Sequence, residues 1–184
     1  MVYNGMIVGK TVNFRAIEER DAEITLKMRL DTNLNAYLNK VEDSVEKQKA
    51  YIITQRQKEG DYLFVAEDKL GNVIGMRGIY DFDPERKTCE TGRLISQGNA
   101  IQNTEIAMFG YDFAFEYLGV DKIRLTVIDA NKTVLNGHKR YGAIELECVY
   151  MKDFGTYSIV SELSRDRYME RRPEFYKLIE RFAV

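Results

Sequence analysis

The sequence contains little that would divide the chain into separate parts. Only two prolines occur among 184 residues, and no Pro-rich or Gly/Ser-rich stretch is present to act as a linker. Hydrophobic residues make up 45% and charged residues 30%, which is ordinary for a soluble globular protein. Since chains of about 100–200 residues usually build one core, we predict a single domain over residues 1–184.

Metal ligands of the sulfur and imidazole type are also scarce. The sequence has two cysteines and one histidine. Cys89 and Cys148 lie far apart and show no CxxC spacing, whereas a structural Cys/His site needs about four ligands. We therefore predict no metal site. Nothing else indicates secretion, so we expect both thiols to be reduced.

There is no excess of positive charge. Lys and Arg total 27 against 29 Asp and Glu, which gives a net charge of −2. Nucleic-acid-binding proteins usually have a basic excess, because their affinity depends on contacts with phosphates. The arginines between residues 165 and 172 are interleaved with acidic residues and are typical of a solvated surface. Nucleic acid is therefore not expected as a partner.

Long hydrophobic runs are missing as well. The first ten residues lack the charged region and sustained apolar region of a signal peptide. The most apolar stretch, residues 106–120, is too short to span a membrane and contains Asp112 and Glu116. We expect a cytoplasmic protein without a membrane partner.

The hydrophobic pattern predicts strands and helices around one sheet. The predicted strands cover residues 12–17, 61–68, 73–82, 88–96, 122–128, 144–151 and 157–163. The predicted helices cover one or two segments within 18–41, then 43–60, 104–118, 131–141 and 173–182. Short turns favour antiparallel pairing in the middle of the chain. The pattern indicates an α+β (mixed α/β) fold with about seven mostly antiparallel strands flanked by helices.

This order and several local motifs resemble the GNAT superfamily of N-acetyltransferases. Glu90-Thr91-Gly92 matches an acidic-x-Gly strand, and Gly142-Ala143 follows Asn131 at the spacing of the family's Gly-Phe. Residues 112–125 resemble the family's passage from helix to strand. Residues 28–39 resemble the first-helix region of the branch that acetylates ribosomal-protein alanine or amino sugars. The resemblance implies a GNAT-like sheet and acetyl-CoA as the acetyl donor, with no metal.

One departure lies in the phosphate-binding loop. The family loop usually reads Arg/Gln-x-x-Gly-x-Gly/Ala, but residues 97–104 read QGNAIQNT. Gly98, Asn99 and Asn103 tolerate left-handed backbone conformations, which would let N–H groups face a phosphate. The alternative is an ordinary capped helix without a ligand. The resemblance assigns cofactor contacts to Leu94, Ile95, Ser96, Gln102, Asn103, Thr104 and Asn131, the last of which also suits a helix N-cap.

The second departure concerns the catalytic groups. The resemblance implies that Glu90 takes a proton from the substrate amine, directly or through water. His138 follows Asn131 by seven residues, where the family often has tyrosine, and would assist departure of the CoA sulfur, with Tyr141 as a second candidate. The alternatives are an exposed edge glutamate, a solvent-facing histidine and a core tyrosine.

The predicted activity is direct transfer of an acetyl group from acetyl-CoA to a primary amine of a small molecule, such as an amino sugar nucleotide. Arg29, Tyr37, Arg77 and Tyr80 are the candidate acceptor-site residues. Two alternatives stay open: an enzyme that acetylates protein N-termini, and a non-catalytic acyl-CoA-binding protein with the same fold. A homodimer is considered alongside a monomer.

Overall fold

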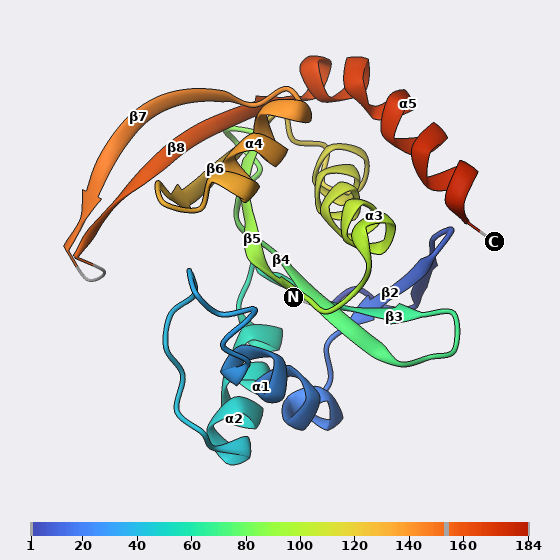
Figure 1. Cartoon of the computed structure of the whole chain (residues 1–184), viewed down its shortest axis with the longest axis vertical. Helices are drawn as coiled ribbons and strands as arrows, with labels where there is room; N and C mark the ends of the chain where they lie inside the picture. The colour runs from blue at the N-terminus through green and yellow to red at the C-terminus, as the bar shows by residue number, and fades with distance from the viewer. Residues whose placement is uncertain (1, 153–154, 184) are drawn as a thin grey trace.

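The chain folds around an eight-stranded sheet with the order β1-β2-β3-β4-β5-β6-β8-β7 (Figure 1). The computed structural model describes residues 2–152 and 155–183. The strands are β1 (Met6–Val8), β2 (Val12–Ala16), β3 (Tyr62–Asp68), β4 (Val73–Asp83), β5 (Thr88–Ser96), β6 (Lys122–Ile128), β7 (Ile144–Met151) and β8 (Thr156–Ser164). The helices are α1 (Ala22–Leu30), α2 (Val45–Gln57), α3 (Ala100–Asp112), α4 (Lys132–Arg140) and α5 (Arg165–Phe182).

All neighbouring strands are antiparallel except β5 and β6, which are parallel and are connected through α3. Their pairing covers only three register positions and ends with Glu90 opposite Arg124. Beyond that point β5 pairs with β4 alone, and β6 pairs with β8 alone. The sheet therefore opens between β5 and β6, and the open edges lie near its middle.

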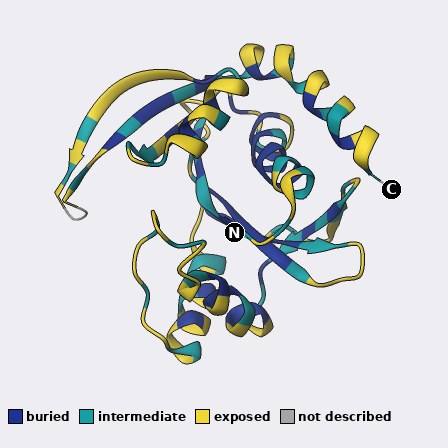
Figure 2. Ribbon diagram, viewed as in Figure 1, coloured by how far each residue is buried: buried dark blue, intermediate teal, exposed yellow. Residues whose placement is uncertain are grey.

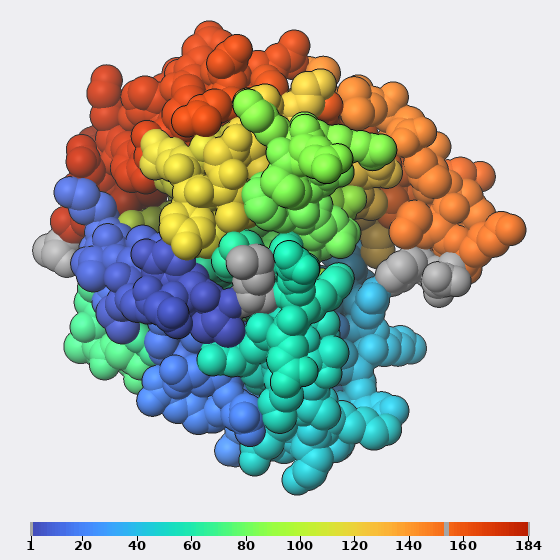
Figure 3. Space-filling model, turned by 180° about the vertical axis from the view of Figure 1, so that it is seen from behind, coloured from blue at the N-terminus to red at the C-terminus, as the bar shows by residue number. Residues whose placement is uncertain are grey.

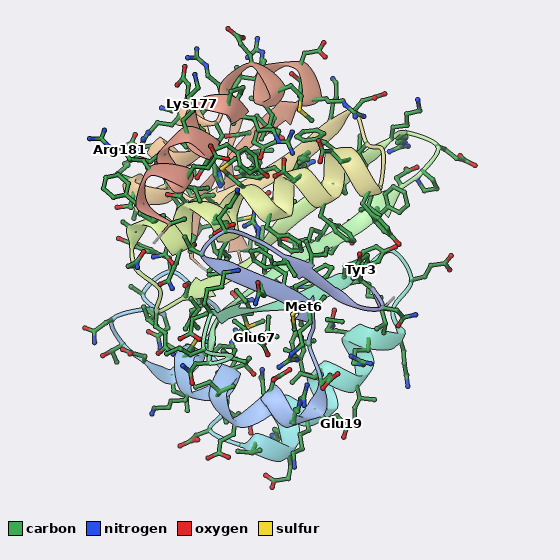
Figure 4. All side chains as sticks on the ribbon, turned by 90° about the vertical axis from the view of Figure 1, so that its right-hand side faces the viewer. Tyr3, Met6, Glu19, Glu67, Lys177 and Arg181 are labelled. Carbon is green, nitrogen blue, oxygen red and sulfur yellow. The ribbon has the colours of Figure 1, made fainter. Side chains whose placement is uncertain are left out.

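A hydrophobic layer covers each face of the sheet (Figure 2). On one face, Phe64 of β3 packs against Phe109 of α3 with ring centroids 4.9 Å apart. On the other face, Ile52 of α2 belongs to the smaller core beneath α1 and α2. Figure 4 shows the layers edge-on, with Lys177 of α5 above the sheet and Glu19 below it. The predicted fold class, α+β with one mostly antiparallel sheet, is confirmed.

The helix α3 starts earlier than the predicted range 104–118. Its N-cap is Asn99, and the side chain of Gln102 returns to the Asn99 backbone N–H in a capping box. This reciprocal cap fixes the start at Ala100. A π-helical turn, Phe113–Tyr117, continues directly from α3. Helical structure therefore extends to one residue before the predicted end at residue 118.

Two predicted regions differ from the structure near the N-terminus. The three-residue strand β1 was not predicted, because it is too short to show alternation; it pairs with β2 and brings the strand number to eight rather than seven. The helices expected within residues 18–41 are limited to a 3-10 turn and α1. Asp31 ends α1, and its side chain accepts the backbone N–H of Asn33 at 2.8 Å, which favours turns over a further helix.

The helix α5 begins at Arg165 rather than at residue 173, where proline was expected to start it. Pro173 is exposed and lies inside the helix. Tyr168 and Ile179 are fully buried on the face that packs against α3, and the Tyr168 hydroxyl donates to Asp112 at 3.0 Å. This tertiary packing outweighs the hydrogen bond that proline removes.

The strands β7 and β8 extend as a long arm past the body of the molecule (Figure 3, orange and red). The outer strand β7 has mostly exposed side chains. Among the described residues, no helix has both the length and the apolar composition that a membrane span requires.

Candidate active site

The opening between β5 and β6 leads into a cavity of about 550 Å³. Its walls come from both sides of the sheet: the end of α1 and the segment after it, strands β4, β5, β6 and β8, and helices α3 and α4. Both open strand edges line it, through Leu94 of β5 and Val127 of β6. We call this cavity the central cleft.

A β-bulge shapes the β5 wall of the central cleft. Between Gly92 and Ile95, β5 has one residue more than β4 has between Gly78 and Met76. Arg93 occupies the bulge with φ of 50°, in the left-handed region. A bulge bends a strand and increases its local twist, and this one follows the point at which β5 stops pairing with β6. This part of β5 includes Leu94, Ile95 and Ser96, which the family resemblance assigns to contacts with acetyl-CoA.

Three arginines line the central cleft, and among its described lining residues there is no Asp or Glu. Arg93 forms a bidentate pair with the buried Asp61 at 2.6 and 2.9 Å, and its guanidinium lies 4.4 Å from the ring centroid of Tyr80. Arg29 donates to the carbonyl of Asn39 at 3.0 Å, while its Nε has no hydrogen-bond partner among the described residues.

Arg77 is the most buried of the three, with only 3% of its surface exposed. It donates through Nη2 to the Thr91 hydroxyl at 3.0 Å. It forms no ion pair with any residue in the described part of the chain, and its Nε lacks a hydrogen-bond acceptor there. Alternation along β4 places Arg77 on the α3 face of the sheet and Tyr80 on the opposite face. All four residues predicted to bind the acceptor line the central cleft: Arg29, Tyr37, Arg77 and Tyr80.

His138 faces the central cleft from α4 and is 9% exposed, so it is not a solvent-facing residue. Burial, with a smaller contribution from the positive charge of Arg77, lowers the pKa of His138 to about 4. The imidazole is thus neutral at physiological pH, and its Nδ1 has no partner among the described residues. The low pKa arises because the side chain is desolvated beside a cation.

Tyr141 also lines the central cleft, next to the end of α4. Its ring lies 5.2 Å from that of Tyr111 and 4.4 Å from that of Phe175, so it contributes to the core as well. Burial raises the pKa of its hydroxyl. Both roles that the sequence allows for Tyr141 are compatible with its position.

Glu90 lies at the vertex where β5 and β6 separate, but it is not among the residues lining the central cleft. Its carboxylate is 3.3 Å from Nε of Arg124. Burial raises the pKa of Glu90, and Arg124 partly offsets that rise. Tyr80, which is paired with Glu90 on the adjacent strand β4, does line the cleft. A proton from the cleft could reach Glu90 most simply through water.

The loop before α3 differs from the expected arrangement. Asn99 has an extended backbone (φ −71°, ψ 175°) rather than a left-handed one. Its side chain accepts the N–H groups of Ile101 and Gln102, both at 3.0 Å. These are the N–H groups that a phosphate would otherwise meet at the helix N-terminus. Since Asn99 is exposed, its side chain can turn away without disturbing the core.

The predicted cofactor residues divide into two groups. Leu94, Asn103, Thr104 and Asn131 line the central cleft, and Asn131 also caps α4 by accepting the N–H of Val134 at 3.3 Å. The others do not line it. The Ile95 side chain is in the core beneath α1 and α2, the Ser96 hydroxyl donates to the Ile74 carbonyl, and Gln102 takes part in the capping box. The bulge at Arg93 and the cap of α3 explain these differences.

Several lining residues were not predicted. Tyr111 and Ala107 follow Asn103 on α3 at intervals of four residues, so one helix face contributes all three. Thr126 follows the buried Ile123 and Leu125 in the alternating pattern of β6, and the buried Ser158 lies on β8 two residues before Val160. Helical spacing from Asn103 and strand alternation would have identified them. Among the described residues, no cluster of His, Cys, Asp and Glu could hold a metal ion.

Known proteins share this fold. Residues 11–144 match the family model described as acetyltransferase (GNAT) domain. An apo structure of FdhC, described as a nucleotide-linked sugar GNAT, is 23% identical with a TM-score of 0.80, over 96% of this chain and 99% of that one. No curated protein matches by sequence.

Two further solved structures have the same fold. Spermidine N-acetyltransferase from Vibrio cholerae, in complex with CoA and spermine, is 18% identical with a TM-score of 0.78, over 88% of this chain and 99% of that one. An acetyltransferase described as putative, from T. thermophilus, is 15% identical with a TM-score of 0.79, over 96% of this chain and 98% of that one. Because the family model covers well over half of the sequence, this chain belongs to the GNAT acetyltransferase family, whose members typically use acetyl-CoA.

Proposed function

We propose that this protein transfers an acetyl group from acetyl-CoA to the primary amine of a small anionic molecule, of the class of amino sugar nucleotides. The observation that supports this best is the central cleft itself. It joins both faces of the sheet, presents the open edges of β5 and β6, and contains three arginines without a described carboxylate in its lining.

Acetyl-CoA supplies the acetyl group as a thioester when it is bound. The open edge of β5 near Leu94 offers backbone groups to an extended ligand, and Asn131 offers a side-chain amide. The N-terminus of α3 suits the phosphates once Asn99 releases the N–H groups of Ile101 and Gln102. Nε of Arg77 and Nδ1 of His138 have no hydrogen-bond partner among the described residues, which supports the entry of a polar ligand into the cleft.

Glu90 accepts the proton of the acceptor amine in this proposal. An amine must lose its proton before it can attack a carbonyl, and a base within reach of one water molecule suffices. The raised pKa of Glu90 suits this role, because a more basic carboxylate takes the proton more readily. The amine then attacks the acetyl carbon directly, so neither cysteine is required as a nucleophile.

The charges of the cleft favour an anionic acceptor over a polyamine. Arg29 and Tyr80 lie on the α1 side, where the acceptor would enter opposite the α3 helix. Arg29 has no ion-pair partner in the described part of the chain. A guanidinium pairs well with phosphate or carboxylate oxygens, whereas a polycation would be repelled. The neighbour described as a nucleotide-linked sugar GNAT is consistent with this acceptor class.

Calorimetry with acetyl-CoA, followed by a thiol-release assay over a panel of amines, tests the proposal. We expect acetyl-CoA binding by the wild type and a loss of about 100-fold or more in kcat/KM for Glu90→Gln. Absence of acetyl-CoA binding would contradict the proposed function. Binding without thiol release for any amine would instead support a non-catalytic acyl-CoA-binding protein, and release with peptides alone would support acetylation of protein N-termini.

A further inference from the structure

The guanidinium of Arg77 is a buried positive charge without a negative partner in the described part of the chain. Its hydrogen-bonding neighbours among the described residues, Thr91 and Tyr111, carry hydroxyl groups and no negative charge at physiological pH. Buried charges are ordinarily paired, because removing an ion from water is strongly unfavourable. A lone cation that lines a cleft is therefore suited to an anion that arrives with the ligand or forms during the reaction.

The side chain of Arg77 is held in place on three sides. Its Cζ lies 5.3 Å from the ring centroid of Tyr111 on α3. A Cβ added to Gly110 would lie 2.4 Å from its Nε, so α3 approaches the guanidinium closely because residue 110 is glycine. Thr91 on β5 holds Nη2. The charge is thus fixed in advance, which is what electrostatic stabilisation of a transition state requires.

The titratable groups around Arg77 do not neutralise it at physiological pH. They come from β4, β5, α3 and α4, and are Tyr80, Cys89, Tyr111, His138 and Tyr141. Burial raises the pKa of the Cys89 thiol to about 12, and it also raises the pKa values of the three tyrosines. His138 is neutral. The positive charge on this side of the cleft is therefore uncompensated by the described residues.

Neutral His138 is a weak proton donor, so it cannot by itself neutralise a departing sulfur. We propose that Arg77 holds the negative charge of the CoA thiolate as it leaves. This inference rests on the proposed function. Once Glu90 has taken the first proton of the ammonium group, the neutral amine nitrogen bonds to the acetyl carbon and the carbon–sulfur bond breaks with its electron pair on sulfur. The second proton of the nitrogen leaves to water in the cleft. His138 donates a neutral hydrogen bond to the same sulfur.

An anionic group of the acceptor is the other ligand that Arg77 could receive. Position argues against it. Arg77 lies against Gly110 and Tyr111 of α3 and near His138, whereas Arg29 lies at the end of α1, where the acceptor enters in this proposal. The two guanidiniums thus serve opposite ends of the reaction, and the experiment separates them because it uses CoA without an acceptor.

The pKa of the bound CoA thiol tests the inference without any turnover. CoA is bound to Cys148→Ser protein, which removes the exposed thiol, and the ultraviolet absorbance of the thiolate is followed against pH. In this Cys148→Ser protein, which retains Arg77, we expect the thiol of bound CoA to titrate about one to three pH units below the thiol of free CoA. Arg77→Lys should keep most of this shift, and Arg77→Gln should lose it.

Two results would overturn the inference: a bound thiol that titrates like free CoA, or an equal shift in Arg77→Gln. The first needs no change at position 77, so a variant that fails to fold does not prevent the test. Arg86→Gln is the matched control, because it makes the same substitution at an exposed arginine between β4 and β5, outside the central cleft; it should retain the shift. Absence of CoA binding in calorimetry would contradict the proposed function as well, whereas binding with an unshifted thiol would contradict this inference alone.

Discussion

Glycine at position 110 gives the clearest single-residue requirement in the structure. The helix α3 passes so close to Arg77 that a methyl group at Gly110 would lie 2.4 Å from its Nε. Arg77 is buried where it contacts the helix, so an added methyl group would have to displace its guanidinium within the cleft. The identity of residue 110 therefore determines where the buried charge lies.

Replacement of Gly110 should destabilise the protein, whereas replacement of Gly137, which also lies in a helix, should not. We expect Gly110→Ala to lower the free energy of unfolding by about 1–3 kcal/mol, because overpacking displaces Arg77. Gly137 in α4 has nothing within 4 Å of an added Cβ, so Gly137→Ala should be neutral or stabilise by up to about 1 kcal/mol. Urea unfolding of both variants checks this. Equal effects would show that Gly110 is not specially packed.

The pairing of Arg124 with Glu90 leads to a prediction about pH. Arg124 lowers the raised pKa of Glu90, so Arg124→Gln should raise it further. A base must be deprotonated to act, and the acidic limb of kcat/KM should therefore move to higher pH. Lys122→Gln is the control, because Lys122 pairs with Glu162 instead. Identical profiles for wild type and Arg124→Gln would contradict the assignment of Glu90 as the base.

At the scale of elements, the start of α3 is stabilised by its own side chains at the place proposed for the phosphates. Asn99 and Gln102 complete a capping box and occupy the N–H groups that a pyrophosphate would use. Where the family loop usually has glycines, this chain has side chains that cap the helix themselves. Ligand binding must compete with that cap.

We therefore expect Asn99→Gly to bind CoA more tightly. Glycine costs an N-cap only a few tenths of a kcal/mol relative to asparagine, and it frees the N–H groups of Ile101 and Gln102. A gain of about 1 kcal/mol corresponds to roughly fivefold in Kd. Calorimetry with CoA measures this, and pantetheine, which lacks the pyrophosphate, is the control and should bind unchanged. Weaker binding of CoA would mean that Asn99 itself contacts the ligand.

Most strands and helices could be predicted because their patterns are long. The strand over residues 122–128 alternates clearly, and its observed bounds are the same. The start of α5 could not be predicted, because Pro173 gives a strong local signal for a first turn. Only the contact of Tyr168 with Asp112, which are distant in sequence, shows that the helix begins earlier.

At the scale of the whole molecule, the central cleft depends on contacts that no local pattern contains. The motif around Glu90 indicated a strand, yet the cleft exists because β5 and β6 stay paired for only three positions. The bulge at Arg93 depends on how β5 pairs with β4. Residues such as Leu94 and Asn131 could be predicted from the family resemblance, whereas the neutrality of His138 follows from burial and from Arg77.

The arrangement of charge in the cleft makes the acceptor class the most direct test of the account. We would measure kcat/KM by thiol release from acetyl-CoA, with a nucleotide-linked amino sugar and with spermidine under identical conditions. Arg29, which has no ion-pair partner among the described residues, and the absence of acidic residues in the described lining predict that the sugar nucleotide is preferred by about tenfold or more. A preference for spermidine, or no thiol release with either amine, would contradict the account.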